Sequence, residues 1–491
     1  MKWYFSFLML MLCVLAIAQE HPNIILIMTD QHRGDCIGKE NSSVITPHLD
    51  QLANDGFWFS NAYSSVPSCT PARAGLLTGM SPWQHGMLGY YKVAEKYPYE
   101  MPQMLRDNGY YTIGIGKMHW HPQRNLHGFH QTILDESGRV ESEGFVSDYR
   151  QWFHQLAPML DADATGIGWN EHRAASYVLA ENLHPTYWTA HTAIRFINAY
   201  KKEQPLFMKI SFARPHSPYD PPKRFLDLYD SLPIPKPFIG EWADQFADFP
   251  ENKDAAFGSY GLDHALNSRR HYLASITFID EQIGKLISTL KANDLYDNTL
   301  ILFVSDHGDM LGDHHHWRKT YAYEGSTRIP FIVKWPKDKD VNVAKGSEMT
   351  QCVELRDVLP TMLSTAGIEQ PLVMDGLSLS NIFDNESAEW RSYIDLEHAT
   401  TYERHNYWCA LTDGKMKYIW FFRTGEEQLF DLINDKGECL SLHSNERYKS
   451  DLKKWRKRMY KHLKERGEPY VRNGQLQAFD NNVLTSPNYP E

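Results

Sequence analysis

Five apolar runs with the composition of buried β-strands recur along the first two thirds of the chain. They occupy residues 23–29, 111–116, 205–213, 299–305 and 329–335. Helical patterns lie between them. Thr46 and Pro47 predict the start of a helix that Gly56 ends, and a second helix has its apolar face within residues 276–290. Because strands that alternate with helices form a sheet covered on both faces, we predict an α/β fold with a large mixed, mainly parallel sheet sandwiched by helices.

The pattern changes after about residue 375. Two segments with short strand-like runs, 407–422 and 426–432, precede a helix with one apolar face. That face carries Leu452, Trp455, Met459 and Leu463. We therefore predict a large domain over residues 19–374 and a smaller α+β subdomain, with a small antiparallel sheet and a helix, over residues 375–491. The basic side of that helix is expected to be a solvated surface.

The first residues have the features of an export signal. A basic start leads into an apolar run with small residues at Ala16 and Ala18, so residues 1–18 are predicted to be a cleaved signal peptide. A membrane anchor is the alternative, but the run is short for a bilayer span. A lipid on Cys13 would need a small preceding residue, and Leu12 stands there. We expect the protein in the periplasm or outside the cell, without stable membrane insertion; a cytoplasmic location would leave the Ala-x-Ala site unexplained.

Charge and cysteine content argue against two further classes of protein. The net charge is 50 − 61 = −11, and no long basic run occurs outside the C-terminal helix, so nucleic acid is not an expected partner. Beyond the signal peptide the chain keeps five widely spaced cysteines, Cys36, Cys69, Cys352, Cys409 and Cys439. This odd and scattered set does not form a dense disulfide framework.

Chemically active side chains follow the predicted strands. Asp30 and Gln31 come after the first strand, and Asp306 and His307 come after the fourth. Ligands of such sheets bind beyond the carboxyl ends of the strands, and carboxylate and amide oxygens are the donors that a hard divalent cation recruits. Other strand ends supply Lys117, His119, His216 and, just ahead of the fifth strand, Lys319. Each residue alone is weak evidence, but together they predict one site.

The segment CTPARAGLLTG, residues 69–79, carries the most specific pattern. Pro71 in a first turn predicts that Cys69 lies at a helix N-terminus, where free N–H groups favour an anion. The segment matches a Cys-x-Pro-x-Arg signature followed by Thr-Gly. With the strand-end residues, over nearly the whole mature chain, it resembles the type I sulfatases of the alkaline phosphatase superfamily. This resemblance implies that a maturase oxidises Cys69 to formylglycine (3-oxoalanine), reading Pro71 and Arg73 as part of its recognition sequence.

The same resemblance implies a set of metal ligands. A calcium ion would be bound by residue 69 and by Asp30, Gln31, Asp306 and His307. Family members commonly have Asp where this chain has Gln31, and often Asn where it has His307. Imidazole is a less natural ligand for a hard cation than oxygen. The difference from the family at His307 therefore leaves the identity of the metal open between calcium and another divalent cation.

The resemblance also implies catalytic roles. Arg73, Lys117 and Lys319 would hold the sulfate oxygens and residue 69. The hydrated aldehyde would be the nucleophile. His216 would protonate the leaving oxygen and His119 would accept a proton as the aldehyde is regenerated, although the opposite assignment of the two histidines stays open.

The function implied is that of an exported sulfatase that acts on a sulfated carbohydrate and releases inorganic sulfate. Aromatic and basic residues in the segment 168–188 suit a charged sugar, although this segment could equally pack over the domain. Two alternatives stay open. One is a phosphonate monoester or phosphodiester hydrolase of the same superfamily, and the other is an inactive homologue that binds sulfated glycans.

Overall fold

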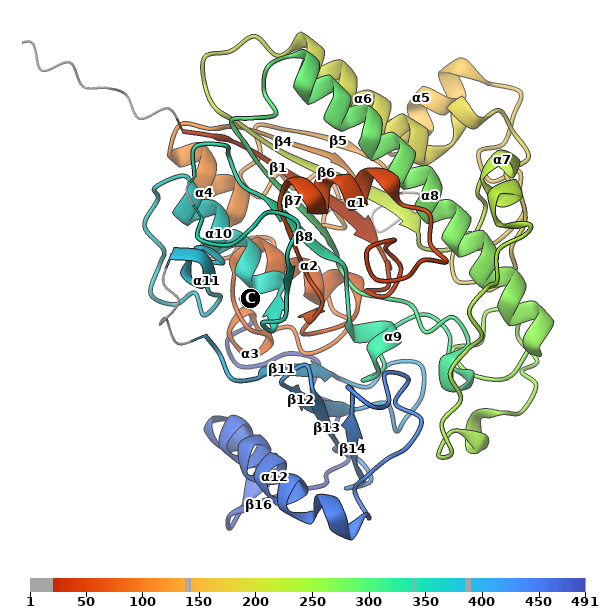
Figure 1. Ribbon diagram of the computed structural model, residues 1–491, viewed down its shortest axis with the longest axis vertical. Helices are drawn as coiled ribbons and strands as arrows, with labels where there is room; N and C mark the ends of the chain where they lie inside the picture. Colours follow the sequence, from red (N-terminus) through yellow and green to blue (C-terminus); the bar gives the residue numbers. More distant parts are fainter. Residues whose placement is uncertain (1–20, 137–138, 140–142, 340, 385–389, 491) are drawn as a thin grey trace, which may run out of the picture.

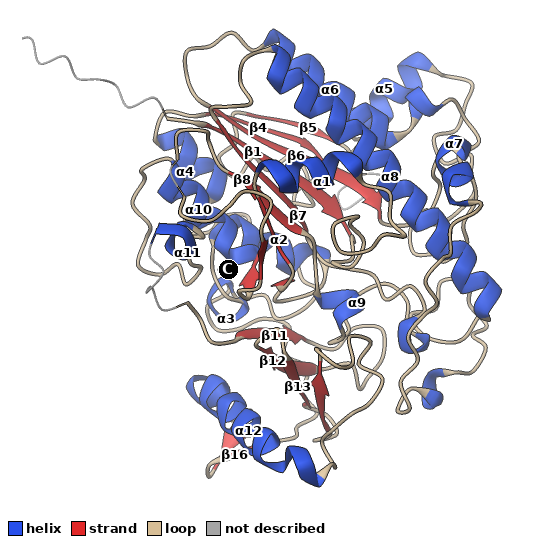
Figure 2. Ribbon diagram, viewed as in Figure 1, coloured by secondary structure: helices blue, strands red, loops and turns tan. Residues whose placement is uncertain are grey.

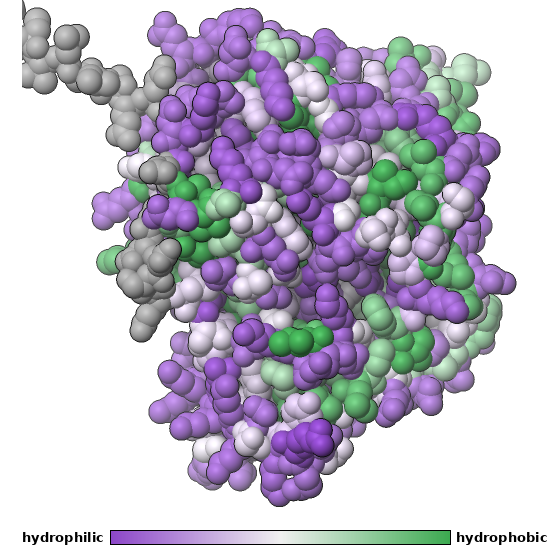
Figure 3. All heavy atoms as spheres, viewed as in Figure 1, coloured by the Kyte–Doolittle hydropathy of each residue, from purple (hydrophilic) through white to green (hydrophobic). Residues whose placement is uncertain are grey.

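The computed structural model describes residues 21–136, 139, 143–339, 341–384 and 390–490 (Figure 1). The predicted signal peptide at residues 1–18 lies outside the described residues. The described chain forms a large sheet flanked by helices and a small second sheet near the C-terminus (Figure 2). The face of the molecule in Figure 3 is mostly hydrophilic, with apolar side chains gathered in separate patches.

The large sheet has eight strands in the order β5-β4-β6-β1-β7-β8-β2-β9. In chain order they are β1 (Asn23–Asp30), β2 (Phe57–Phe59), β4 (Tyr111–Gly116), β5 (Gln131–Leu134), β6 (Leu206–Pro215), β7 (Thr299–Ser305), β8 (Phe331–Lys334) and β9 (Glu348–Met349). Within the group β5-β4-β6-β1-β7, each pair of neighbouring strands is parallel. Their carboxyl ends therefore lie at one edge, and the fold is the mainly parallel α/β fold expected from the sequence.

The strand β8 makes the sheet mixed. Its run, 329–335, resembles the parallel strands in composition, but β8 pairs antiparallel with β7 and with β2. A parallel pair needs a crossover that carries the chain back to the other end of the sheet. The connection between β7 and β8 contains only the short helices η4 (Asp313–His315) and α9 (Glu324–Thr327). The chain thus stays at the carboxyl edge, where this connection supplies site residues.

Helices cover both faces of the large sheet. They include α1 (Pro47–Asp55), α2 (Cys69–Thr78), α4 (Met101–Asp107), α5 (Asp148–Leu156), α6 (Pro185–Ala199), α8 (Leu262–Ala292) and α10 (Val358–Thr365). Ile25 and Ile27 of β1 pack with α1, α6 and α8, whereas Leu26 and Met28 pack with α2, α4 and α10. Successive strand residues point to opposite faces, so β1 is buried on both sides.

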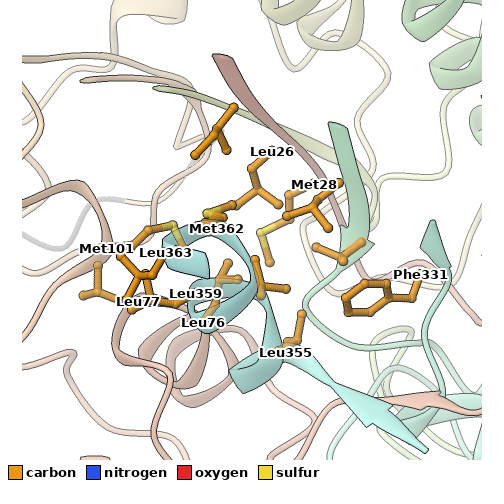
Figure 4. Close-up of a cluster of buried hydrophobic side chains, with 14 of the residues drawn as sticks. Leu26, Met28, Leu76, Leu77, Met101, Phe331, Leu355, Leu359, Met362 and Leu363 are labelled. Carbon is orange, nitrogen blue, oxygen red and sulfur yellow. The ribbon is translucent and has the colours of Figure 1, made fainter. Parts of the chain in front are cut away.

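The core on the second face fixes the position of α2. Figure 4 shows Leu76 and Leu77 of α2 grouped with Leu359 and Met362 of α10 and with Met28 of β1. Each fully buried leucine contributes about 2 kcal/mol to folding. Since the C-terminal half of α2 is held in this core, its first residue is held at the carboxyl edge of the sheet.

The C-terminal part contains a four-stranded antiparallel sheet and a helix. These elements are β11 (Ile394–His398), β12 (Trp408–Thr412), β13 (Met416–Phe421), β14 (Glu427–Asp431) and α12 (Lys449–Leu463). The apolar face of α12 packs in one cluster with this sheet, as expected. The smaller α+β subdomain is therefore present, while its boundary near residue 375 stays a prediction. Among the residues that the structure describes, no helix combines the length and apolar character of a membrane span.

Candidate active site

Cys69 is the first residue of α2, as the proline in the first turn predicts. Its side chain is fully buried. The Sγ atom lies 3.2 Å from His307 Nε2 and 3.3 Å from Lys319 Nζ. Burial and Asp30 act to raise the pKa of the Cys69 thiol, but Lys319, Lys117 and His307 outweigh them and lower it to about 6. Position 69 is thus arranged to stabilise negative charge.

The four predicted donors Asp30, Cys69, Asp306 and His307 come together as one group. All are buried, and their ligand atoms lie within 4.8 Å of one another. The cause is the sheet: β1 and β7 are parallel neighbours, with Thr29 opposite Ser305. The residues that follow these two strands therefore meet, although they are far apart in the sequence. Two carboxylates and an imidazole at this spacing are a donor set that fits one divalent cation.

The imidazole of His307 is oriented by its neighbour. Nδ1 lies 2.9 Å from the carbonyl oxygen of Gly308 and donates to it, so Nε2 presents its lone pair to Cys69 and the carboxylates. Burial lowers the pKa of His307, but Asp306 and Cys69 raise it more, and the net shift is upward. A histidine whose Nδ1–H is held by a carbonyl oxygen and whose Nε2 faces carboxylates has the arrangement of a metal ligand.

Gln31 completes the group from a strained backbone position. Its φ of 68° is in the left-handed region. Its backbone amide nitrogen donates to Asp306 Oδ1 at 3.0 Å, and its side-chain Oε1 accepts from Lys319 Nζ at 2.9 Å. The turn after β1 therefore points an amide oxygen into the same centre as the carboxylates.

Arg73 lies directly beneath this centre, one turn along α2 from Cys69. Its side chain is fully buried, and Nε and Nη2 bond Asp306 Oδ2 and Asp30 Oδ2 at 2.9–3.0 Å. Nη1 donates to the carbonyl oxygen of Lys117 at 2.6 Å and to Ser211 Oγ at 3.2 Å. All five donors of the guanidinium are thus bound within the protein, and Arg73 ties the two carboxylates together.

Lys117 and Lys319 reach the centre from two different segments: Lys117 follows β4, and Lys319 lies in the connection between β7 and β8. Lys117 Nζ lies 2.5 Å from Asp30 Oδ2. Burial lowers the pKa of Lys117, while Asp30 and Cys69 oppose the shift. Lys319 bridges Gln31 and Cys69. The predicted cationic residues are therefore gathered around residue 69.

His119 and His216 lie at the same edge. His216 Nδ1 is 2.9 Å from the carbonyl oxygen of Ser217, and its buried Nε2 has no hydrogen-bond partner among the described residues. His119 Nε2 accepts from Arg139 Nη1 at 2.6 Å. Burial lowers the pKa of both histidines well below 6.5; Lys319 adds to the shift at His216, and Arg139 at His119. Burial thus favours the neutral form of both rings.

Sequence reasoning missed several residues of this site. Tyr90 OH lies 4.0 Å from Cys69 Sγ, and the Trp169 ring centroid lies 5.7 Å from that of His216. Both side chains are partly exposed. Glu136 Oε1 accepts the amide of His119 at 2.8 Å. Glu136 follows β5, a strand that the apolar runs do not reveal, and Tyr90 and Trp169 lie in loops without a recognisable motif. No local signal therefore marks these residues.

The segment 168–188 mostly packs over the domain. His172 stacks on Trp317 with ring centroids 4.6 Å apart, and Trp188 is buried in α6. Trp169 is the residue of this segment that reaches His216. The two interpretations of the segment therefore apply to different parts of it.

The sheet and the site define a hydrolase of the alkaline phosphatase-like class. The chain matches the family model Sulfatase over residues 22–368 and the model N-sulphoglucosamine sulphohydrolase, C-terminal, over residues 312–465. It is 38% identical over 470 residues to an arylsulfatase of Clostridium perfringens, covering 93% of this chain and 97% of that protein. It is 31% identical over 445 residues to a choline-sulfatase of Rhizobium meliloti, covering 87% and 83%. The chain belongs to the sulfatase family and is a sulfuric ester hydrolase.

A solved structure shares the fold at greater distance. It is a protein in complex with its substrate D-glucosamine-2-N,6-O-disulfate, with a TM-score of 0.73 and 22% sequence identity. The match covers 91% of this chain and 99% of that chain. The fold therefore extends over both the large sheet and the C-terminal subdomain.

Proposed function

We propose that this sulfatase is exported and hydrolyses a sulfate ester of a sulfated carbohydrate, using a formylglycine at position 69 and one calcium ion. The observation that carries the proposal is the position of Cys69. It begins a buried helix, next to a lysine and within a cluster of metal-type donors. A thiol needed only for packing would not require these neighbours.

Asp30, Gln31, Asp306 and His307 would hold the cation together with residue 69. A bound divalent cation would supply positive charge that favours ionisation of a hydroxyl on residue 69 and offsets charge on the sulfate oxygens. The aldehyde hydrate would supply the attacking hydroxyl. Since Cys69 and Arg73 are buried in the folded chain, the maturase would read its recognition sequence before folding is complete.

The cationic residues divide into two roles. Lys319 contacts residue 69 directly, and Lys117 lies against Asp30, so both would hold the nucleophile and the sulfate oxygens. The donors of Arg73 are already bound to Asp30, Asp306 and their surroundings. We therefore assign Arg73 to the carboxylates rather than to the sulfate.

The two histidines would move protons at different steps of the reaction. Nε2 of His216 faces the site because Nδ1 is anchored on Ser217, so this nitrogen would carry the proton to the leaving oxygen. The negative charge of a bound sulfate favours protonation of His216. His119 would accept a proton from residue 69 as the aldehyde is regenerated.

The partly exposed rings of Tyr90 and Trp169 support a ring-shaped leaving alcohol. Aromatic side chains present flat apolar faces on which sugar or aryl rings stack. They lie beside the nucleophile and beside the proposed acid, His216, respectively. The sulfated sugar bound by the solved structure of the same fold is consistent with this substrate class.

The test is a comparison of kcat/KM for the matured enzyme on sulfated mono- and disaccharides, choline sulfate, nitrophenyl sulfate and an aryl phosphonate monoester. We expect the highest value on a sulfated saccharide, with no turnover by Cys69→Ala. A higher value on the phosphonate would favour the phosphonate hydrolase. Tight binding of sulfated saccharides without sulfate release from matured protein would identify an inactive binding homologue.

A further inference from the structure

We propose that Asp309 is a positioning residue that orients the side-chain amide of Gln31 toward residue 69, an inference that rests on the proposed role of Gln31 as a ligand. Asp309 follows β7 and is fully buried. Its carboxylate contacts Nε2 of Gln31, whereas Oε1 of Gln31 contacts Lys319, which in turn contacts Cys69. It would act on the reaction only through the groups it holds.

Asp309 accepts four hydrogen bonds, two at each oxygen. Oδ2 accepts from Gln31 Nε2 at 2.5 Å and from Tyr219 OH at 2.6 Å. Oδ1 accepts from the backbone amides of Leu311 and Arg318, each at 3.0 Å. One oxygen thus serves the side chain of Gln31, and the other serves the connection that carries Lys319.

These contacts permit one orientation of the Gln31 amide. Its Nε2 faces the Asp309 carboxylate, and its Oε1 faces the Lys319 ammonium at 2.9 Å. The reversed amide would set oxygen against a carboxylate and an NH₂ group against an ammonium, losing two charge-assisted hydrogen bonds and creating two repulsions. Asp309 and Lys319 therefore hold the amide oxygen toward the centre from opposite ends.

The second oxygen of Asp309 holds the backbone beside Lys319. Arg318 and Thr320 flank Lys319 with φ values of 67° and 82°, both in the left-handed region. Arg318 is held by Asp309, and Thr320 is held by the subdomain, where Trp408 Nε1 donates to its carbonyl oxygen at 2.9 Å. Such a backbone persists only where its surroundings hold it on both sides. Asp309 thus positions both partners of the Gln31–Lys319 contact.

An exchange of the two partners tests the orientation. In Asp309→Asn, the oxygen of the new amide can serve the two backbone amides only by turning its NH₂ group toward Nε2 of Gln31. In Gln31→Glu, a carboxylate faces the Asp309 carboxylate. In the double variant, the NH₂ group of the introduced asparagine can donate to the introduced glutamate, and an oxygen again faces Lys319. If Asp309 only stabilised the fold, a change at position 31 would not restore what Asp309→Asn loses.

Two readouts are needed on the full-length protein. The first is calcium affinity of chelator-stripped enzyme by isothermal titration calorimetry with calcium chloride. The second is the thermal unfolding midpoint of the stripped enzyme. Loss of a group that orients a metal ligand costs about 10- to 100-fold in metal affinity. We expect this loss of calcium affinity in Asp309→Asn and a lowered midpoint in each single variant, with recovery of most of both losses in the double variant.

A matched control separates this effect from the loss of any buried carboxylate. Asp280 is buried and accepts the backbone amides of His48 and Leu49 at 3.1 and 2.7 Å. Asp280→Asn should lower the unfolding midpoint without changing calcium affinity. Calcium binding by Asp309→Asn as tight as that of the wild type, or a double variant no more stable than the less stable single variant, would overturn the role of Asp309. If wild-type enzyme binds no calcium but turns over, the proposed metal is wrong, and the midpoints decide the Gln31–Asp309 pairing by their non-additivity.

Discussion

Replacement of Arg73 by Met should destabilise the metal-free enzyme far more than the calcium-loaded enzyme. Arg73 is fully buried and bonds both Asp30 and Asp306. Without the guanidinium, two carboxylates face each other in the interior. Lys117 still pairs with Asp30, but Asp306 keeps no lysine or arginine partner among the ion pairs of the described residues.

The size of the effect follows from the geometry. Ligand oxygens of Asp30 and Asp306 lie within 4.8 Å, and two unit charges at this separation repel by about 3.5 kcal/mol at an effective dielectric constant of about 20. Removing one partner of a buried ion pair typically costs about 3 to 5 kcal/mol. We therefore expect the free energy of unfolding of stripped Arg73→Met to fall by about 3 to 5 kcal/mol. Calcium would take over the neutralisation and reduce this deficit.

The assay is urea unfolding of stripped and calcium-saturated protein, with Arg466→Met as the control. Arg466 is buried and pairs with Glu397 through two bonds of 2.7 Å in the C-terminal subdomain. Its replacement should cost a similar amount, but equally with and without calcium. A deficit of Arg73→Met that calcium leaves unchanged, or one below about 1 kcal/mol, would refute the reasoning.

Three further outcomes are expected. His216→Gln should slow hydrolysis of sugar sulfates by about 10²- to 10⁴-fold and hydrolysis of nitrophenyl sulfate much less. His119→Gln should release a burst of nitrophenol from nitrophenyl sulfate before slow turnover. Equal rate losses of His216→Gln on both substrates, with no burst in His119→Gln, would leave both histidines as binding residues. Exhaustive chelation should abolish turnover and added calcium should restore it, so unchanged rates in chelator would exclude metal dependence. Burial lowers the pKa of His85, His172 and His314 to about 3, so the unfolded state binds more protons below about pH 6.5. The free energy of unfolding should therefore fall as pH drops from 6.5 toward 3, by up to about 1.4 kcal/mol per pH unit for each histidine. Calorimetric unfolding at several pH values in that range measures this fall, and a free energy of unfolding that stays constant would contradict the prediction.

Much of the sheet could be predicted because buried strands and capped helices leave local signals. The runs 111–116 and 299–305 coincide with β4 and β7, and Pro47 and Gly56 mark the ends of α1. Most of the site followed from one topological rule. The carboxyl ends of parallel strands lie at one edge, so residues that follow them converge.

The remaining features depend on contacts between distant segments. The apolar pattern of 329–335 records burial but not direction, so the antiparallel pairing of β8 could not be inferred from it. Nothing local shows that the guanidinium of Arg73 turns inward to two carboxylates. Asp309 lies in the same short run as Asp306, and its acidic character was visible, but its contact with Gln31 arises only when β1 and β7 pair.

The central claim is that residue 69 acts as an aldehyde made from cysteine. The most direct test is mass spectrometry of the tryptic peptide 40–73 from active enzyme, carried out on preparations with different specific activities. The peptide should show the thiol of Cys69 replaced by an aldehyde, and specific activity should rise in proportion to the converted fraction. Full activity in a preparation whose residue 69 is unmodified cysteine would contradict the account.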